Sequence, residues 1–172
     1  MKRSRRAVRI ALSGLAALLF TFVWAQPAHA WTWANGVTVY NGAGLCVRGN
    51  AGIDHFIPGS FSGNLAYADT FALSAGCGAG LTLPDGWAAV RLEVQKWNGS
   101  AWTVCRSTDW EYGPTGVSGG EFGGPWGPSQ ILDYGGSSSC GAGWYGTMAY
   151  AYAHDGTAWR GGGVWSGQEH VP

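Results

Sequence analysis

A run at residues 90–95 alternates strictly between apolar and polar side chains, and this alternation restricts the fold more than any other feature of the chain. Every second residue is Val or Leu, and the residues between them are Arg, Glu and Gln. This pattern is typical of a strand with one dry and one wet face. Period-two runs recur at residues 65–71 and 145–153, whereas helix-forming residues never accumulate with a period of 3.6 residues.

Glycine and aromatic residues dominate the remainder of the chain. The 172 residues include 30 Gly and 11 Trp, and most of the apolar runs are short. Short strands rich in aromatic and β-branched residues, separated by glycine turns, are typical of antiparallel sandwiches. We therefore predict an all-β chain, a single antiparallel β-sandwich of about seven or eight short strands.

Two hairpins are predicted from matching turn sequences. Residues 97–102 read WNGSAW and residues 154–159 read HDGTAW, so Asn-Gly and Asp-Gly occupy equivalent places. In the first hairpin, a three-residue connection would set Val94 opposite Val104, and it is preferred because it buries apolar residues against each other. A two-residue turn would set Val94 opposite Thr103 instead.

Residues 1–30 have the form of an export signal. Five basic residues precede an apolar run at residues 10–24, and Ala28-His29-Ala30 is a small-x-small cleavage site. The apolar run is shorter than the roughly 20 residues that span a bilayer. We expect the signal to be removed, leaving a secreted, extracellular domain of residues 31–172 with no membrane segment. General and twin-arginine export both remain open.

Without the signal, the charge balance excludes some partners. Five of the ten Lys and Arg lie in residues 1–30, whereas none of the ten Asp and Glu does. Residues 31–172 therefore carry a net charge of 5 − 10 = −5. A net-acidic chain with scattered basic residues lacks the basic patch that binds nucleic acid. It also lacks the cluster that holds a protein on an anionic membrane.

Four cysteines, an even number, predict two disulfides in an exported chain. Three pairings are possible, and we favour the sequential one, Cys46–Cys77 with Cys105–Cys140. A metal site is the rival interpretation, but the spacings of 31, 28 and 35 residues contain no C-x-x-C pair. We therefore predict no metal and no cofactor.

No constellation of residues predicts catalysis. The three histidines after residue 30 lie far apart in the sequence, and no G-x-S-x-G nucleophile motif is present. Asp109 and Glu111 are two residues apart and would be candidates for glycoside hydrolysis. Acidic residues on the wet face of a sheet are usually only solvated, however. The chain is therefore predicted not to be an enzyme.

Aromatic residues at turns and ends indicate a binding surface instead, because Trp and Tyr are frequent anchors in interfaces. The predicted partner-binding residues are Trp31, Thr32, Trp33, Ala34 and Trp126. The N-terminal four could extend into a partner's cleft or add to its sheet. Alternatively, they could form an edge strand that covers its own sheet, and the sequence leaves both alternatives open.

Over residues 31–172 the chain resembles the small secreted adaptor subunit of the umbrella-shaped toxin particles of filamentous soil bacteria. The resemblance is carried by the export signal, the compact four-cysteine β domain, the aromatic N-terminal segment, and the sequences Gly-Thr-Met-Ala-Tyr and Trp-Arg-Gly-Gly near the end. It implies a non-catalytic sandwich that links a large repeat-bearing toxin protein to a lectin-like or propeller subunit, in a particle directed against competing bacteria. It also implies that residues 31–34 act as an insert.

Other functions are alternatives to the adaptor. A carbohydrate-binding module is suggested by Trp110, Tyr112 and Trp126, and a secreted protease inhibitor by a rigid loop at residues 113–129. A hydrolase using Asp109 and Glu111 ranks last.

Overall fold

The computed structural model describes residues 30–55, 65–118, 125–134 and 140–171, so the predicted export signal lies outside the described residues except for Ala30. The regular structure of the described residues is almost all strand, and the only helical element among them is the short 3-10 turn η1 (Ala75–Cys77). The strands are β1 (Ala30–Gly42), β2 (Leu45–His55), β3 (Leu65–Ser74), β4 (Ala88–Trp97), β5 (Trp102–Ser107), β6 (Glu111–Gly113), β7 (Val117–Ser118), β8 (Pro125–Trp126), β9 (Ser129–Asp133), β10 (Gly143–His154), β11 (Trp159–Trp165) and β12 (Glu169–Val171).

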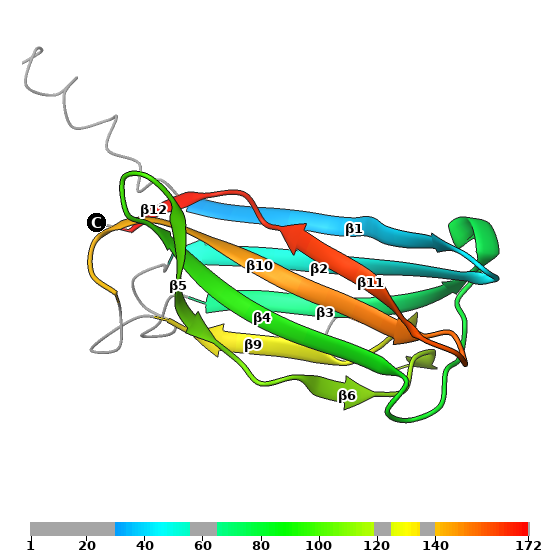
Figure 1. Ribbon diagram of the computed structural model, residues 1–172. Coiled ribbons are helices and arrows are strands. Elements are labelled where there is room, and N and C mark those ends of the chain that lie inside the picture. Colours follow the sequence, from blue (N-terminus) through cyan, green and yellow to red (C-terminus); the bar gives the residue numbers. More distant parts are fainter. Residues whose placement is uncertain (1–29, 56–64, 119–124, 135–139, 172) are drawn as a thin grey trace, which may run out of the picture.

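The strands form two antiparallel sheets, which confirms the predicted all-β class. The four-stranded sheet has the order β1-β2-β3-β9. The six-stranded sheet has the order β11-β10-β4-β5, with β12 paired to β10 and β6 paired to β4. Figure 1 shows the sheets as two layers, with β4 and β10 in front of β2 and β3. A separate ribbon of β7 and β8 lies in the stretch predicted to be a loop.

The predicted number of strands was too low. Strands β6, β7, β8 and β12 contain only two or three residues each. A strand of that length shows no alternation in the sequence, because period two needs about four residues to be recognised. Strands β6 and β12 extend the six-stranded sheet beyond what the pattern reveals, whereas β7 and β8 form the separate ribbon. Strand β6 becomes part of the candidate site below.

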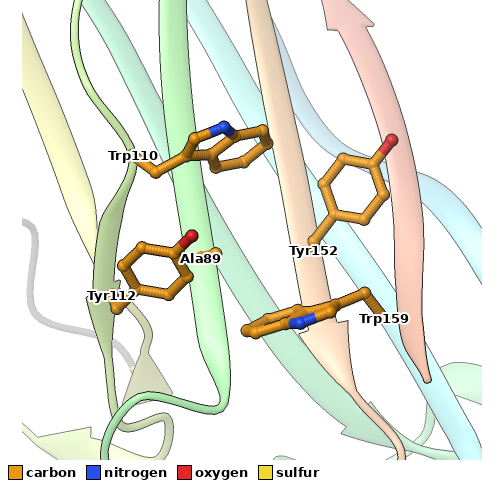
Figure 2. A pocket seen from close by; sticks show the side chains of 5 residues that line it. All are labelled: Ala89, Trp110, Tyr112, Tyr152 and Trp159. Carbon is orange, nitrogen blue, oxygen red and sulfur yellow. The ribbon is translucent and has the colours of Figure 1, made fainter.

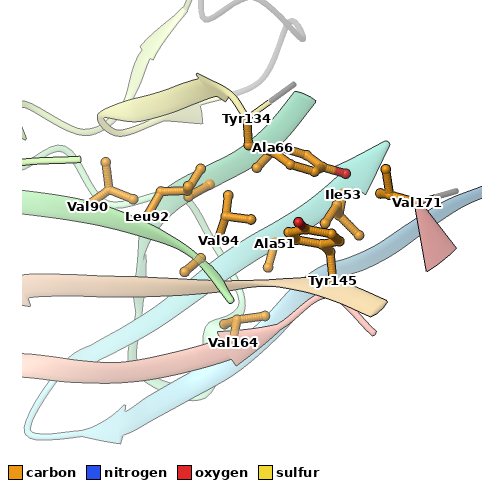
Figure 3. Close-up of a cluster of buried hydrophobic side chains, with 12 residues drawn as sticks. Ala51, Ile53, Ala66, Val90, Leu92, Val94, Tyr134, Tyr145, Val164 and Val171 are labelled. Atoms are coloured by element: carbon orange, nitrogen blue, oxygen red, sulfur yellow. The ribbon is translucent and has the colours of Figure 1, made fainter. Parts of the chain in front are cut away.

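The core lies between the two sheets, where the dry face of β4 meets β2 and β3. Val90, Leu92 and Val94 are fully buried, as the alternation predicted, and they share one cluster with Ile53 of β2. At one end of this cluster the rings of Tyr134 and Tyr145 lie 5.5 Å apart (Figure 3). Burying each such aliphatic side chain stabilises the fold by about 1.5–3 kcal/mol.

The favoured disulfide pairing is confirmed. Cys46 at the start of β2 is bonded to Cys77 of η1, and Cys105 of β5 is bonded to Cys140, just before β10. Each bridge therefore ties one sheet to a segment that is distant in the sequence. The pairing also fits an extracellular or otherwise oxidising compartment.

The predicted register of the β4–β5 hairpin was wrong. Val94 lies opposite Arg106, and the bulge between this pair and the next one leaves Cys105 without a partner in the ladder. The loop contains four residues, because Trp97 pairs with Trp102 and Asn98 N–H donates to the Ala101 carbonyl at 3.0 Å. As a result Val104 is exposed rather than buried.

The second hairpin closes with an equivalent loop, as the matching sequences suggested. Asp155 Oδ1 accepts hydrogen bonds from the N–H groups of Thr157 and Ala158, both at 2.8 Å. Asn98 Oδ1 accepts the corresponding bonds from Ser100 and Ala101 at 2.9 Å. Only the aspartate carries a charge, and its Oδ2 lies 2.7 Å from the Arg160 Nε.

This difference predicts an acid-sensitive β10–β11 hairpin. Hydrogen bonds from Thr157 and then Arg160 hold the pKa of the Asp155 carboxyl below its ordinary value. The ionised Asp155 carboxylate therefore stabilises the fold fully above its unfolded-state pKa of about 3.9. This stabilisation is lost as the pH falls through the lower pKa that Asp155 has in the native state. We expect Asp155→Asn to be less stable than wild type in urea at pH 7, and the difference to shrink at pH 3. An equal difference at both pH values would contradict this account.

Candidate binding surfaces on the outer faces

The outer face of the six-stranded sheet carries the wet residues of β4 and a large set of aromatic rings. Since Val90, Leu92 and Val94 point into the core, Ala89, Arg91, Glu93, Gln95 and Trp97 point outward. The exposed rings over this sheet are Trp87, Trp97, Trp110, Tyr112, Trp144 and Trp159. The concentration of aromatic surface on one face makes it the first candidate site.

One end of this face contains a pocket, here called the aromatic pocket. It is lined by Ala89, Trp110, Tyr112, Tyr152 and Trp159 and has a volume of about 220 Å³. The register explains it, because Ala89 of β4 lies between Tyr112 of β6 and Tyr152 of β10. A small residue flanked by two large ones leaves a depression, and Figure 2 shows Ala89 between the four rings.

The rings of the aromatic pocket support one another across the strands. The Trp110 and Tyr152 rings are 5.7 Å apart, and the Tyr112 and Trp159 rings are 5.9 Å apart, both edge to face. His154 extends the set, because its ring lies 5.4 Å from Trp159. Edge-to-face pairs at these distances are favourable. The rings are therefore held in place while Tyr112 remains 56% exposed.

A polar stripe follows the aromatic pocket along β4. Arg91 Nη2 lies 3.0 Å from Glu93 Oε1, and Gln95 Nε2 and the Tyr150 hydroxyl each donate to Glu93 Oε2 at 3.2 Å. Burial and the neighbouring Glu93 raise the pKa of Tyr150. The phenol therefore stays protonated and donates to the carboxylate at neutral pH. The stripe has donors and acceptors but no net charge.

A second aromatic pocket lies at the other end of β4. It is lined by Trp97, Trp102, Trp144 and Gln168 and has a volume of about 250 Å³. Beside it, the ring of Trp165 lies over Gly146, where a Cβ atom would overlap that ring. The Trp165 ring in turn lies 4.8 Å from that of Trp102. Close approach of a ring to the backbone is a reason for glycine in a strand.

The outer face of the four-stranded sheet carries a separate group, here called the N-terminal aromatic surface: Trp31, Trp33, Tyr67 and Ile131. Three of these residues lie in one register row with Gly52, in the order Trp33, Gly52, Tyr67, Ile131. The Trp33 ring lies over Gly52, 5.7 Å from Tyr67 and 6.0 Å from Trp31. Trp31 is 64% exposed, the highest value among the large apolar side chains that are exposed.

The structure places the predicted partner-binding residues in different environments. Residues 31–34 belong to edge strand β1, so the edge-strand alternative holds and the segment is paired with β2 rather than free. Trp31 and Trp33 face outward, whereas Ala34 packs against the core and Thr32 is half-buried. The backbone of Trp126 in β8 pairs with that of Val117 in β7, but the side chain of Trp126 lies outside what the structure describes.

The two carboxylates considered for hydrolysis are not brought into the aromatic pocket. Asp109 and Glu111 are exposed, and neither lines the pocket that Trp110 and Tyr112 form. Glu111 pairs with Val90, so it alternates with Tyr112 and lies on the opposite side of β6.

Within the described ranges, no three His, Cys, Asp or Glu residues are grouped so that they could hold a metal ion. No helix in those ranges is long and apolar enough to span a membrane.

Sequence reasoning missed Tyr152 and Trp159 as members of the site. Both lie in the second hairpin, more than 40 residues after Trp110, and only the pairing of β6 and β10 with β4 brings them together. The signal that could have found Trp159 is the WNGSAW and HDGTAW match, which marks an aromatic residue at the end of each loop. No protein-family model matches the chain, and neither a curated protein nor a solved structure does.

Proposed function

We propose that this chain is a secreted, non-catalytic adaptor that holds a different partner on each outer face of its sandwich. The observation that carries the proposal is the presence of exposed aromatic rings on both outer faces. Trp31 and Ile131 are exposed on the four-stranded sheet, and Trp110, Tyr112 and Trp159 on the six-stranded sheet. Because the sheets pack through their inner faces, the two groups point in opposite directions.

Aromatic surface of this kind supports binding rather than catalysis. Trp and Tyr combine a large rigid apolar area with a polar group, and they dominate the energetics of many interfaces. A stable monomer rarely exposes contiguous apolar patches without a function for them. Two disulfides make the scaffold rigid, so both surfaces keep a fixed orientation relative to each other.

The partners are proposed from the resemblance described above. In a toxin particle of that kind they would be a repeat-bearing toxin protein and a lectin-like or propeller subunit, outside the cell and directed against competing bacteria. Residues 31–34 remain the proposed contact for one of them. Because this segment is strand β1, it would bind through Trp31 and Trp33 on its outer face rather than as a free insert.

Paired surface variants test the adaptor. We expect Trp31→Ala with Trp33→Ala to lose one secreted partner and Trp110→Ala with Trp159→Ala to lose the other, each by at least about tenfold in affinity. The measurement is capture of partners from native culture fluid, followed by light scattering of the reconstituted complexes. Point variants are preferable to deletion of residues 31–36, because deletion would also remove part of the β1–β2 ladder.

The outcomes separate the alternatives. Wild-type protein should form a ternary complex, and each variant pair should leave one binary complex intact. If one face accounts for both partners, or if both variant pairs retain both, the adaptor proposal is wrong. Far-UV circular dichroism of each variant checks that the fold is retained.

A carbohydrate-binding module is the second candidate, and the aromatic pocket specifically favours it. Trp110 and Tyr112, two of the residues that suggested it, lie in this pocket with two further rings. The protease-inhibitor alternative has no such support: its loop, residues 113–129, includes residues 119–124, which lie outside the described residues.

A further inference from the structure

We infer that the outer face of the six-stranded sheet binds a neutral, linear polysaccharide that lies along β4. The aromatic pocket, the polar stripe and the second aromatic pocket follow one another on this strand, from Ala89 to Trp97. The inference goes beyond the adaptor proposal, because it places a glycan on the face where that proposal places the second protein partner. An adaptor of this kind would join a protein on its N-terminal aromatic surface to a glycan.

The rings match the apolar faces of sugar units. A pyranose presents axial C–H bonds on its faces and hydroxyl groups around its edge, so its faces stack on the electron-rich faces of aromatic rings. Tyr112 and Trp159 are exposed at one pocket, and Trp97 and Trp144 at the other. Both pockets are open depressions bounded by rings that contact each other, so a stacked sugar would meet walls already in position.

The polar stripe matches the hydroxyl edge. Hydroxyl groups both donate and accept, and the stripe offers both functions through Arg91, Glu93 and Gln95. A guanidinium has five N–H donors and a carboxylate has several lone pairs, so both groups have capacity beyond their mutual contact. Most pockets for polar ligands combine apolar walls with a few placed polar groups of this kind.

The charge of the stripe selects a neutral ligand. Arg91 is 3.0 Å from Glu93, so its charge is balanced before any ligand arrives. A polyanion would also be repelled by the net −5 charge of residues 31–172. A cation would have to compete for Glu93 with Arg91, Gln95 and Tyr150, which already surround it. An uncharged chain of hydroxyl-bearing units avoids both costs.

The length of the site selects a polymer. Ala89 and Trp97 are eight residues apart on one strand, which corresponds to about 26 Å at the rise of a β-strand. A single sugar could fill only one pocket, whereas a linear oligosaccharide could occupy both and the stripe between them. Proline-rich peptides also bind aromatic grooves. Their prolines have no N–H donor, however, so a peptide of this kind would use the acceptors of the stripe poorly.

Affinity electrophoresis and pull-down with defined polysaccharides test the inference. The purified protein would be incubated with insoluble chitin, cellulose and soluble xylan, with polygalacturonate as the anionic probe and polyproline as the peptide probe. We expect retention by at least one neutral polysaccharide, and tighter binding of oligosaccharides long enough to reach both pockets. Trp159→Ala and Trp144→Ala should each weaken retention by roughly tenfold, and Trp159→Phe should restore much of it.

Trp31→Ala is the matched control, because it removes an exposed tryptophan from the opposite face. It should leave glycan retention unchanged and weaken the binding of the adaptor's protein partner. Loss of glycan binding and loss of binding to the protein partner can thus be measured separately. Retention of polyproline or polygalacturonate in preference to every neutral polysaccharide, no retention of any, or equal losses in Trp31→Ala and Trp159→Ala would overturn the inference. Thermal unfolding of each variant confirms that a folded protein is being compared.

Discussion

Replacing Cys46 and Cys77 together by alanine is expected to lower the free energy of unfolding by about 3 kcal/mol. The bridge joins residues 31 apart and ties the start of β2 to η1, so its loss enlarges the unfolded ensemble. Cys46 is also fully buried beside the core, and its sulfur would be only partly replaced by an alanine methyl group. Denaturation in guanidinium chloride, followed by tryptophan fluorescence, measures the loss.

The other disulfide is the control for this prediction. Cys105 and Cys140 are 35 residues apart, so the chain-entropy contribution of their bridge should be nearly the same. Cys140 is exposed and Cys105 half-buried, however, so their replacement removes less native packing. We therefore expect the Cys105→Ala, Cys140→Ala variant to be destabilised less than the first variant. The reverse order would show that burial of Cys46 does not contribute as argued.

The parts of the fold that depend on long regular patterns could be predicted. Alternation on β4 identified the buried residues Val90, Leu92 and Val94, and the even number of cysteines indicated two bridges. The register of the β4–β5 hairpin could not be predicted, because it depends on two local features. Asn98 closes a four-residue loop with its side chain, and a bulge at Cys105 shifts the rest of β5. Neither feature changes the pattern of apolar residues.

The candidate site could be predicted only in part, for a related reason. Trp110 and Tyr112 were recognisable as exposed aromatic residues, but their partners Tyr152 and Trp159 come from a strand pairing across β4. Trp31 and Trp33 were recognised too, but the position of Trp33 on the sheet face depends on Gly52, where a Cβ atom would lie 2.7 Å from the Trp33 Cζ3. Contacts of this kind are set by tertiary register, which the sequence of one strand does not contain.

Glycine at points of close approach links these surfaces to the stability of the sandwich. Strand β11 contains three consecutive glycines, Gly161 to Gly163, opposite the residues of β10 that carry the site. Gly161 pairs with Tyr152, whose ring forms part of the aromatic pocket. The three positions differ in what surrounds them, and the sequence alone gives no indication of which one is intolerant.

Gly161→Ala is expected to destabilise the protein by about 3 kcal/mol and to distort the aromatic pocket. A Cβ atom at Gly161 would overlap the carbonyl oxygen of Ala151 and lie 2.7 Å from the Tyr152 Cα, so relief requires β11 to move away from β10. Backbone atoms cannot rotate aside as a side chain can. Gly162→Ala is the matched control, because its Cβ would lie at an ordinary 3.5 Å from the Val39 Cβ and should change stability little. Thermal unfolding of both variants checks the difference, and near-ultraviolet circular dichroism reports the tryptophan environment. Equal stability of the two variants would mean that the β10–β11 pair accommodates the methyl group, and the close approach at Gly161 would then not be a constraint on the site.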